Sequence, residues 1–335
     1  MGIIRDKRKL DISYVPKKVP CREEEIEKVE MLLESGGRVV ISGEIGTGKT
    51  LIAKFVAKDA IYVNCLIRRS ERAVLREILS QAVHDYNEDG DLWEDLPDNI
   101  SVILDEIDGI DDLRHFLYTL SRAGEIGKEI RYIAITRDLS MLKQLVNDSA
   151  TWSTFAENCS IHLNKYNKGE ILEILDFRAK EALRAGSYDD DVLDLISEIA
   201  LSSEGHMRTG IEVLRNSAML AEMKGEKEIS PEDVRKVNFN AGIKNLDELG
   251  EYEAITLLSI ALLCRKRACV SKEEVEKAYL VNCENYGIEA PPIDTSLAIL
   301  ERSGLIAMRG NKCLLLVPAT TLISRLEKTI HDTIS

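Results

Sequence analysis

The first half of the chain alternates short apolar runs with amphipathic segments. The apolar runs have the length of strands buried on both faces, and they lie at residues 38–42, 61–65, 101–104, 131–136 and 160–163. Between them apolar residues recur with helical spacing, as Leu113, Phe116, Leu117 and Leu120 do. Strands that alternate with helices favour a parallel α/β sheet, which binds its ligands at the carboxyl ends of the strands.

Beyond residue 167 the pattern changes to helices only. Four segments show a period of 3.6 residues, namely 170–183, 190–201, 207–223 and 230–237. A third pattern starts near Glu251 and combines three helical runs, two apolar strands around a turn and a closing helix, at residues 253–264, 272–286, 294–303, 304–317 and 320–334. Three helices followed by a hairpin are typical of a winged helix-turn-helix, with 294–303 as its recognition helix.

These patterns divide the chain into three predicted domains. An α/β domain covers residues 1–165, an all-α domain, called the lid here, covers 166–245, and a winged-helix domain covers 246–335.

A glycine-rich turn lies between the first strand and a helical run. Residues 43–50 have the spacing G-x-x-x-x-G-K-T, in which glycines let backbone N–H groups converge on phosphates at a helix N-terminus. Lys49 supplies a positive charge to the phosphates and Thr50 a hydroxyl ligand for Mg²⁺. We therefore predict a nucleotide site formed by Gly46, Thr47, Gly48, Lys49, Thr50 and Leu51.

The third strand ends in two carboxylates, Asp105 and Glu106. A buried strand that ends in this way beside a P-loop holds Mg²⁺ and orients a water molecule. The sequence therefore predicts that the chain binds ATP and ADP together with Mg²⁺.

Composition narrows the class of protein. With 335 residues, 44% of them hydrophobic and 30% charged, the chain has room for two or three ordinary globular domains. No apolar run approaches the roughly 20 residues that cross a bilayer. Seven scattered cysteines suggest reduced thiols. We expect a cytoplasmic protein without membrane association.

Charge is unevenly placed. The net charge of −14 argues against a generic nucleic-acid coat protein. Residues 1–22 nevertheless carry seven Lys and Arg against two Asp. This segment is either a solvated tail or a basic arm that contacts phosphate.

Ordered motifs along nearly the whole chain resemble the archaeal origin-recognition and cell-division-control family of AAA+ replication initiators. The motifs are Tyr14-Val15-Pro16 with Arg22-Glu23, the P-loop, residues 62–66, residues 104–108, Leu117-Tyr118-x-Leu120, Tyr166-Asn167 with Arg178, Gly205-x-x-Arg208 and the winged helix.

The resemblance implies roles for further residues. Asp105 would bind Mg²⁺ and Glu106 would polarise water. Tyr166 and Arg178 would close over the nucleotide from the lid, and Arg208 would sense the γ-phosphate.

The resemblance also implies partners. These are double-stranded origin DNA, the replicative helicase and paralogous initiator subunits, in a nucleoid-associated cytoplasmic protein. We expect the DNA contacts to come from Arg302, Arg309 and Lys312.

Three departures from the family pattern bear on hydrolysis and DNA recognition. Arg137 stands where the family usually has an asparagine, residues 138–165 contain no arginine, and the stretch between Cys65 and Ile100 is short. Arg137 would either reach the γ-phosphate or pair with Glu106. Both positions favour slow hydrolysis, with ATP acting as a switch and Arg137 joining Asp105 and Glu106 at the catalytic centre.

Two other functions fit the sequence less well. Residues 250–335 carry ten Lys and Arg against eleven Asp and Glu, a net charge of −1, which is weak for a DNA module. The predicted recognition helix carries Asp294, Glu301 and Arg302. A regulatory ATPase whose winged helix binds protein is therefore an alternative. A clamp-loader-like motor is a second alternative. The absence of arginine from residues 138–165 disfavours it.

Overall fold

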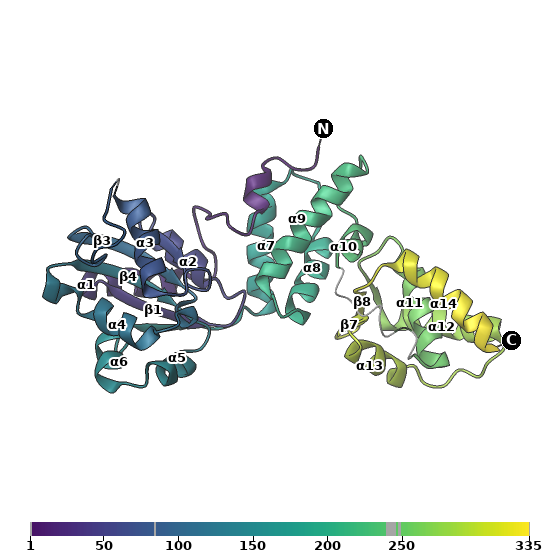
Figure 1. Ribbon diagram of the computed structural model, residues 1–335. Coiled ribbons are helices and arrows are strands. Elements are labelled where there is room, and N and C mark those ends of the chain that lie inside the picture. Colours follow the sequence, from purple (N-terminus) through teal and green to yellow (C-terminus); the bar gives the residue numbers. More distant parts are fainter. Residues whose placement is uncertain (1, 84, 239–245, 247–248, 335) are drawn as a thin grey trace. The chain divides into compact units, whose positions relative to one another are not determined.

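The computed structural model describes residues 2–83, 85–238, 246 and 249–334 (Figure 1). Internal contacts separate two compact units. One is Val15–Tyr166, and the other joins Met1–Tyr14 to Asn167–Ser335. In the described part of the chain no helix has the length and apolar character that a membrane crossing requires.

The first unit is built on a parallel sheet with the strand order β2-β3-β4-β1-β5. Its strands are β1 (Arg38–Gly43), β2 (Ile61–Asn64), β3 (Asn99–Asp105), β4 (Glu129–Ile135) and β5 (Ser160–Leu163). The parallel sheet predicted from the apolar runs is confirmed. Six helices accompany it in the described residues, α1 (Glu23–Gly36), α2 (Lys49–Val56), α3 (Glu71–Ala82), α4 (Leu113–Ser121), α5 (Leu139–Val146) and α6 (Ser149–Phe155).

Alternation along the strands creates two cores, one on each face of the sheet. On β3, Ile103 joins the core formed with α1 and α2, whereas Val102 and Leu104 join the core formed with α3, α4, α5 and α6. The same alternation runs through β1 and β4. Both faces are therefore covered, as buried parallel sheets require.

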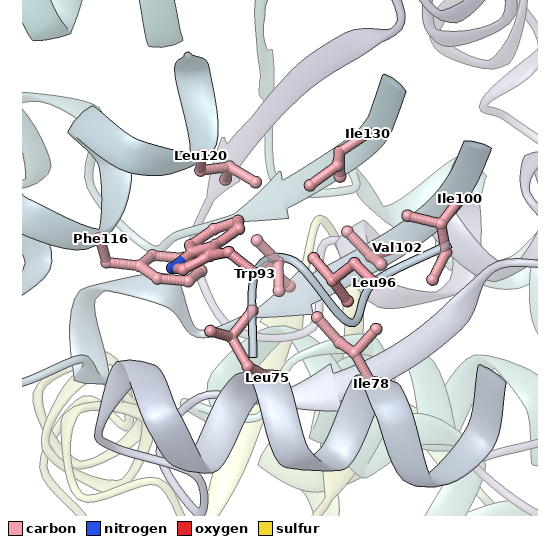
Figure 2. Close-up of a pocket in the computed structure, with 10 residues that line it drawn as sticks. Leu75, Ile78, Trp93, Leu96, Ile100, Val102, Phe116, Leu120 and Ile130 are labelled. Atoms are coloured by element: carbon pink, nitrogen blue, oxygen red, sulfur yellow. The ribbon is translucent and has the colours of Figure 1, made fainter. Parts of the chain in front are cut away.

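A small apolar cavity lies in the second of these cores. Figure 2 shows the rings of Trp93 and Phe116 beside aliphatic side chains from α3, β3, β4 and the segment before β3. The cavity measures about 10 Å³, and its lining is apolar throughout. A space of this size holds at most one water molecule, so it is no ligand site.

The four helical segments predicted beyond residue 167 are present in the second unit. They are α7 (Lys168–Ala182), α8 (Asp190–Ser202), α9 (Met207–Met223) and α10 (Pro231–Val237). Asn167 and Glu170 form a capping box at the start of α7, and Ser230 and Asp233 form another at the start of α10. The predicted end of the lid at residue 245 lies outside the described residues.

The N-terminal arm, residues 2–14, packs on these helices rather than on the sheet, which differs from the predicted 1–165 domain. Figure 1 shows it, in purple, beside α7 and α9. Arg5 donates to the carbonyl oxygens of Lys180 and Glu181 at the end of α7. Lys9 forms an ion pair with Glu181. Arg5 and Lys9 therefore both have partners within the protein.

The C-terminal part of this unit combines helices with a small antiparallel sheet of order β6-β8-β7. Its elements are α11 (Glu251–Leu263), β6 (Cys269–Ser271), α12 (Lys272–Tyr286), α13 (Asp294–Arg302), β7 (Ile306–Arg309), β8 (Lys312–Leu315) and α14 (Ala319–Ile334). The predicted hairpin turns between Arg309 and Lys312, which are paired across the turn. Strand β6 was not predicted, because three residues are too few to show the alternation of a strand.

A buried arginine joins α10 to this C-terminal part. Arg235 is 0% exposed and donates to the carbonyl oxygens of Leu315, Cys264, Arg267 and Ala268 at 2.7–3.1 Å. A guanidinium with no such acceptors would be expensive to bury, so these carbonyls keep α10 in place.

Candidate nucleotide site and nucleic-acid surface

The P-loop follows β1 and leads into α2. Gly43, Gly46 and Gly48 have positive φ values of 147°, 78° and 93°, which side chains rarely allow. A Cβ on Gly48 would also lie 2.8 Å from the Tyr166 hydroxyl oxygen. The buried Thr47 closes the loop by donating from Oγ1 to the Glu44 carbonyl oxygen at 2.9 Å. Leu51 follows in the first turn of α2, partly buried against its core.

The Lys49 ammonium lies over the loop that precedes it. Its Nζ donates to the carbonyl oxygens of Gly43 at 2.5 Å and Glu44 at 2.7 Å. The helix begins at Lys49, so the ammonium and the positive end of the helix dipole meet at the same point. This combination attracts phosphate.

A buried arginine supports the P-loop from the other side. Arg22 is 4% exposed and donates to the carbonyl oxygens of Thr47 at 3.3 Å and Asn164 at 2.6 Å. Its guanidinium carbon lies 3.9 Å from the ring centroid of Tyr166. Burial raises the pKa of Tyr166, so its hydroxyl stays protonated beside Gly48. The P-loop is therefore clamped between the start of α1 and the end of β5.

Asp105 ends β3 next to Thr50. Its Oδ2 accepts from Thr50 Oγ1 at 2.8 Å and from the Tyr62 hydroxyl at 3.0 Å. A hydroxyl and a carboxylate in contact are the hard oxygen donors that Mg²⁺ takes, with nucleotide phosphates and water completing its shell. Among the described residues no group of three or more His, Cys, Asp or Glu could hold a metal ion without such help.

Glu106 has a different environment from its neighbour. Its backbone is left-handed, with φ 54°, which costs roughly 1–2 kcal/mol for a residue other than glycine. One carboxylate oxygen accepts from Arg137 at 3.4 Å, and the other lies 3.5 Å from Asn64 Nδ2. Of the two positions considered for Arg137, the structure shows the pairing with Glu106.

Backbone contacts hold both partners of Glu106. Arg137 follows β4, and its carbonyl oxygen accepts from the Gly43 N–H at 3.2 Å. Asn64 ends β2, and its Oδ1 accepts from the N–H groups of Leu66 and Ile67. This orientation turns the Asn64 amide nitrogen toward Glu106.

The lid residues predicted to contact nucleotide are distributed over both units. Tyr166 is the last residue of the first unit and not part of the lid. Arg178 is 3% exposed and donates to the carbonyl oxygens of Lys9 at 2.9 Å and Tyr14 at 3.1 Å, so it holds the N-terminal arm. Its nucleotide contact stays a prediction. Arg208 is exposed in the first turn of α9, and its sensor role stays a prediction.

The three residues predicted to bind DNA differ in availability. Lys312 and Arg302 are exposed. Arg309 instead forms a bidentate ion pair, with Nε and Nη2 at 2.9 and 2.5 Å from the carboxylate oxygens of Glu198. Glu198 is 1% exposed and also lies 2.6 Å from Lys168 Nζ. The Glu198 carboxylate is buried and the Arg309 side chain is 46% exposed, so this charge-assisted pair engages the guanidinium at the protein surface.

Sequence reasoning missed four residues that shape these sites. Tyr62 and Asn64 lie in the motif at residues 62–66, and Arg22 lies in the motif Arg22-Glu23, but none of the three was given a role. Glu198 lies in a helical pattern. For the two on β2, alternation along a strand next to the carboxylate strand was an available signal. For Arg22 and Glu198 no local signal existed, because their partners are distant in the sequence.

The parallel sheet, the P-loop, the paired carboxylates and the helices that follow define the class: this is a P-loop ATPase of the AAA+ type with a helical lid. The model of the Cdc6 AAA+ ATPase-type lid domain matches residues 172–238. The chain is 28% identical over 327 residues to an ORC1-type DNA replication protein 1 of Sulfurisphaera tokodaii, covering 86% of this chain and 81% of that one. A second protein of the same description, from Archaeoglobus fulgidus, is 28% identical over 324 residues and is covered to 78%.

Solved structures agree with this. The crystal structure of Cdc6p from Pyrobaculum aerophilum has a TM-score of 0.86 and 26% identity, with full coverage of both chains. The ORC1 protein of Aeropyrum pernix in complex with DNA has a TM-score of 0.62 at 22% identity over 99% of both chains, which shows a shared fold. Over most of its length the chain resembles the archaeal Orc1/Cdc6 family, as its motifs suggested.

The P-loop geometry predicts the effect of removing Lys49. In Lys49→Ala, the affinities for ATP and ADP should fall about 10- to 100-fold or more, because the phosphates lose a charge-assisted hydrogen bond of about 1.5–3 kcal/mol. Calorimetric titration measures both affinities, and circular dichroism checks the fold. Lys58→Ala, which removes an exposed lysine just after the same helix, is the matched control. Equal affinities in wild type and Lys49→Ala would refute the site.

Proposed function

We propose that this chain is an ATP-binding replication initiator that recognises double-stranded origin DNA and helps to load the replicative helicase. The observation that carries the proposal is the site at the end of β3, where Thr50 and Asp105 stand 2.8 Å apart beside the P-loop. Its support is the match to ORC1-type DNA replication proteins over most of the chain. Paralogous initiator subunits are the expected partners in assembly.

In this proposal the P-loop and Lys49 bind the phosphates of ATP or ADP. Thr50 and Asp105 would hold Mg²⁺, which supplies positive charge to the β- and γ-phosphates when bound. Tyr166 and Arg22 keep the loop in shape. Arg208, on the second unit, would report the presence of the third phosphate, as arginines of mobile segments do.

The same geometry favours ATP as a switch with slow hydrolysis. Glu106 is the group that would orient the attacking water, yet Arg137 and Asn64 occupy its two oxygens. The exposed ion pair with Arg137 is weak, because the two side chains are 56% and 31% exposed. In this proposal the pair competes with a water molecule for the same carboxylate. Hydrolysis therefore requires a rearrangement of Glu106.

The C-terminal elements have the order helix, strand, two helices and hairpin, which is that of a winged helix. We propose a three-domain division close to the predicted one, with the arm assigned to the lid. DNA contact would come from Lys312 at the hairpin turn and Arg302 on α13. Arg309 joins them only if it leaves Glu198.

A protein partner for this domain is the second candidate function. Two observations favour it: the domain's net charge of −1 and the withdrawal of Arg309 into the pair with Glu198. Lys272 and Asp294 also neutralise each other at the start of α13. A DNA reader would normally present free cations there.

The pairing of Glu106 predicts that Arg137→Asn accelerates hydrolysis. Wild-type turnover should lie below about one per minute, far under typical kcat values, and the variant should be about tenfold faster, equivalent to about 1.4 kcal/mol of barrier. Steady-state phosphate release with and without DNA provides the measurement.

Arg131→Asn, which removes another exposed arginine of the same sheet, serves as the control and should leave turnover unchanged. A slower Arg137→Asn variant would mean that the guanidinium acts on the γ-phosphate. Wild-type turnover near 1 s⁻¹ would contradict the switch, because it requires an arginine finger from elsewhere.

The hairpin predicts different effects for its two cations. Binding to duplex DNA should lose affinity with salt, and Lys312→Ala should lower the slope of log K against log salt by about 1, as expected for one phosphate contact. Arg309→Ala should change the slope less, because Glu198 holds the guanidinium. Fluorescence anisotropy over a salt series measures both slopes. A wild type with no salt-dependent DNA binding would favour the protein-binding alternative.

A further inference from the structure

The hydroxyl of Tyr62 is bonded to the carboxylate that ends β3. It donates to Asp105 Oδ2 at 3.0 Å, and the same oxygen accepts from Thr50 Oγ1 at 2.8 Å. Asp105 is 6% exposed, so bulk water does not replace these donors. Two donors on one oxygen restrict rotation of the carboxylate about its Cβ–Cγ bond.

Strand geometry explains how Tyr62 reaches this position. In the parallel pairing of β2 with β3, Tyr62 stands opposite Ile103 and Asn64 stands opposite Asp105. Side chains two residues apart share a face, so Tyr62, Asn64 and Asp105 all face α2. Tyr62 accordingly packs on the core that contains Ile52 and Ala53 of this helix.

Contacts around the ring keep Tyr62 in place as a donor. Lys54 Nζ, on α2, lies 3.8 Å from the ring centroid. A tyrosine hydroxyl carries its proton at neutral pH, so Tyr62 orients Asp105 by donating to it.

We propose that Tyr62 is a positioning residue for Mg²⁺ binding, acting through Asp105. Together with Thr50 it holds the carboxylate in one orientation before the metal and nucleotide arrive. Tyr62 does not contact the metal in this proposal. The inference rests on the proposed function, since it requires that Asp105 and Thr50 bind Mg²⁺ with ATP.

The expected size of the effect follows from other metal sites. Outer partners that orient a ligating carboxylate typically change metal affinity by 10- to 100-fold when they are removed. We expect the lower end, about tenfold, because Thr50 still holds the same oxygen in the variant. ATP binding without Mg²⁺ depends on the P-loop and should not change.

The test compares Tyr62→Phe with a matched tyrosine variant. Tyr132 lies on β4, is 3% exposed and donates to the Phe155 carbonyl oxygen at 3.2 Å. Tyr132→Phe therefore removes a buried hydroxyl from the same unit, away from the site. ATP affinity is measured by calorimetry in EDTA and over a series of Mg²⁺ concentrations for wild type and both variants.

In Tyr62→Phe, the Mg²⁺ concentration that gives half of the gain in ATP affinity should rise about tenfold. The affinity in EDTA should equal that of wild type, and Tyr132→Phe should behave as wild type throughout. An unshifted Mg²⁺ midpoint in Tyr62→Phe, or an equal shift in both variants, would overturn the positioning role.

If the proposed function is wrong, the same titrations give a different result. A wild type that binds no ATP would refute the proposed function before any variant is compared. A wild type that binds ATP with no response to Mg²⁺ would overturn the metal site and the role of Tyr62 with it.

Discussion

Parallel pairing of β2 with β3 sets Asn64 opposite Asp105, and most of the nucleotide site depends on that register. It places Tyr62 and Asn64 on the same face as the carboxylate and next to the helix that follows the P-loop. A slip of one residue would turn both side chains toward the opposite core. Asp105 would then lose the Tyr62 hydroxyl, and Glu106 would lose the Asn64 amide.

The register gives two neighbouring carboxylates different tasks. Asp105 is nearly buried and receives two hydroxyl donors, an arrangement that suits a fixed metal ligand. Glu106 follows in a left-handed conformation that turns it away from the strand, toward Asn64 and Arg137. In the proposed function, nucleotide binding and hydrolysis are therefore separable, because the first would need Asp105 as it stands and the second would need Glu106 to move.

Two arginines outside the P-loop are also bonded to groups of the protein itself. Cations that a sequence would assign to phosphate are engaged by the protein's own groups, since Arg178 holds the N-terminal arm and Arg309 holds Glu198. Burial strengthens the bonds of Arg178, which is 3% exposed, whereas Arg309 is 46% exposed and only its partner Glu198 is buried.

Features with local causes could be predicted from the sequence. The P-loop needs glycines at positions with positive φ, and the strands around it are apolar on both faces, so Gly48, Lys49 and Asp105 were identified together with the parallel sheet. Even the pairing of Arg137 with Glu106 was one of two positions considered. All of these depend on residues within or next to a strand end.

Features with distant causes could not be predicted. Arg178 lies 169 residues from Lys9, and Arg309 lies 111 residues from Glu198. The family resemblance suggested nucleotide for Arg178, and its position in the hairpin suggested DNA for Arg309. Nothing in the surrounding sequence reveals a carbonyl or a buried carboxylate that arrives from elsewhere. The assignment of the N-terminal arm to the lid has the same cause, since Arg5 and Lys9 find their acceptors at the end of α7.

The central claim is that this site binds ATP while its water-orienting carboxylate is withheld. A crystal structure of the chain with Mg²⁺ and ATP tests this most directly. The account predicts that Lys49 Nζ leaves the carbonyl oxygens of Gly43 and Glu44 for the phosphates, while Glu106 stays bonded to Arg137. A Glu106 side chain released from Arg137 and bonded to a water molecule in line with the γ-phosphate would contradict it.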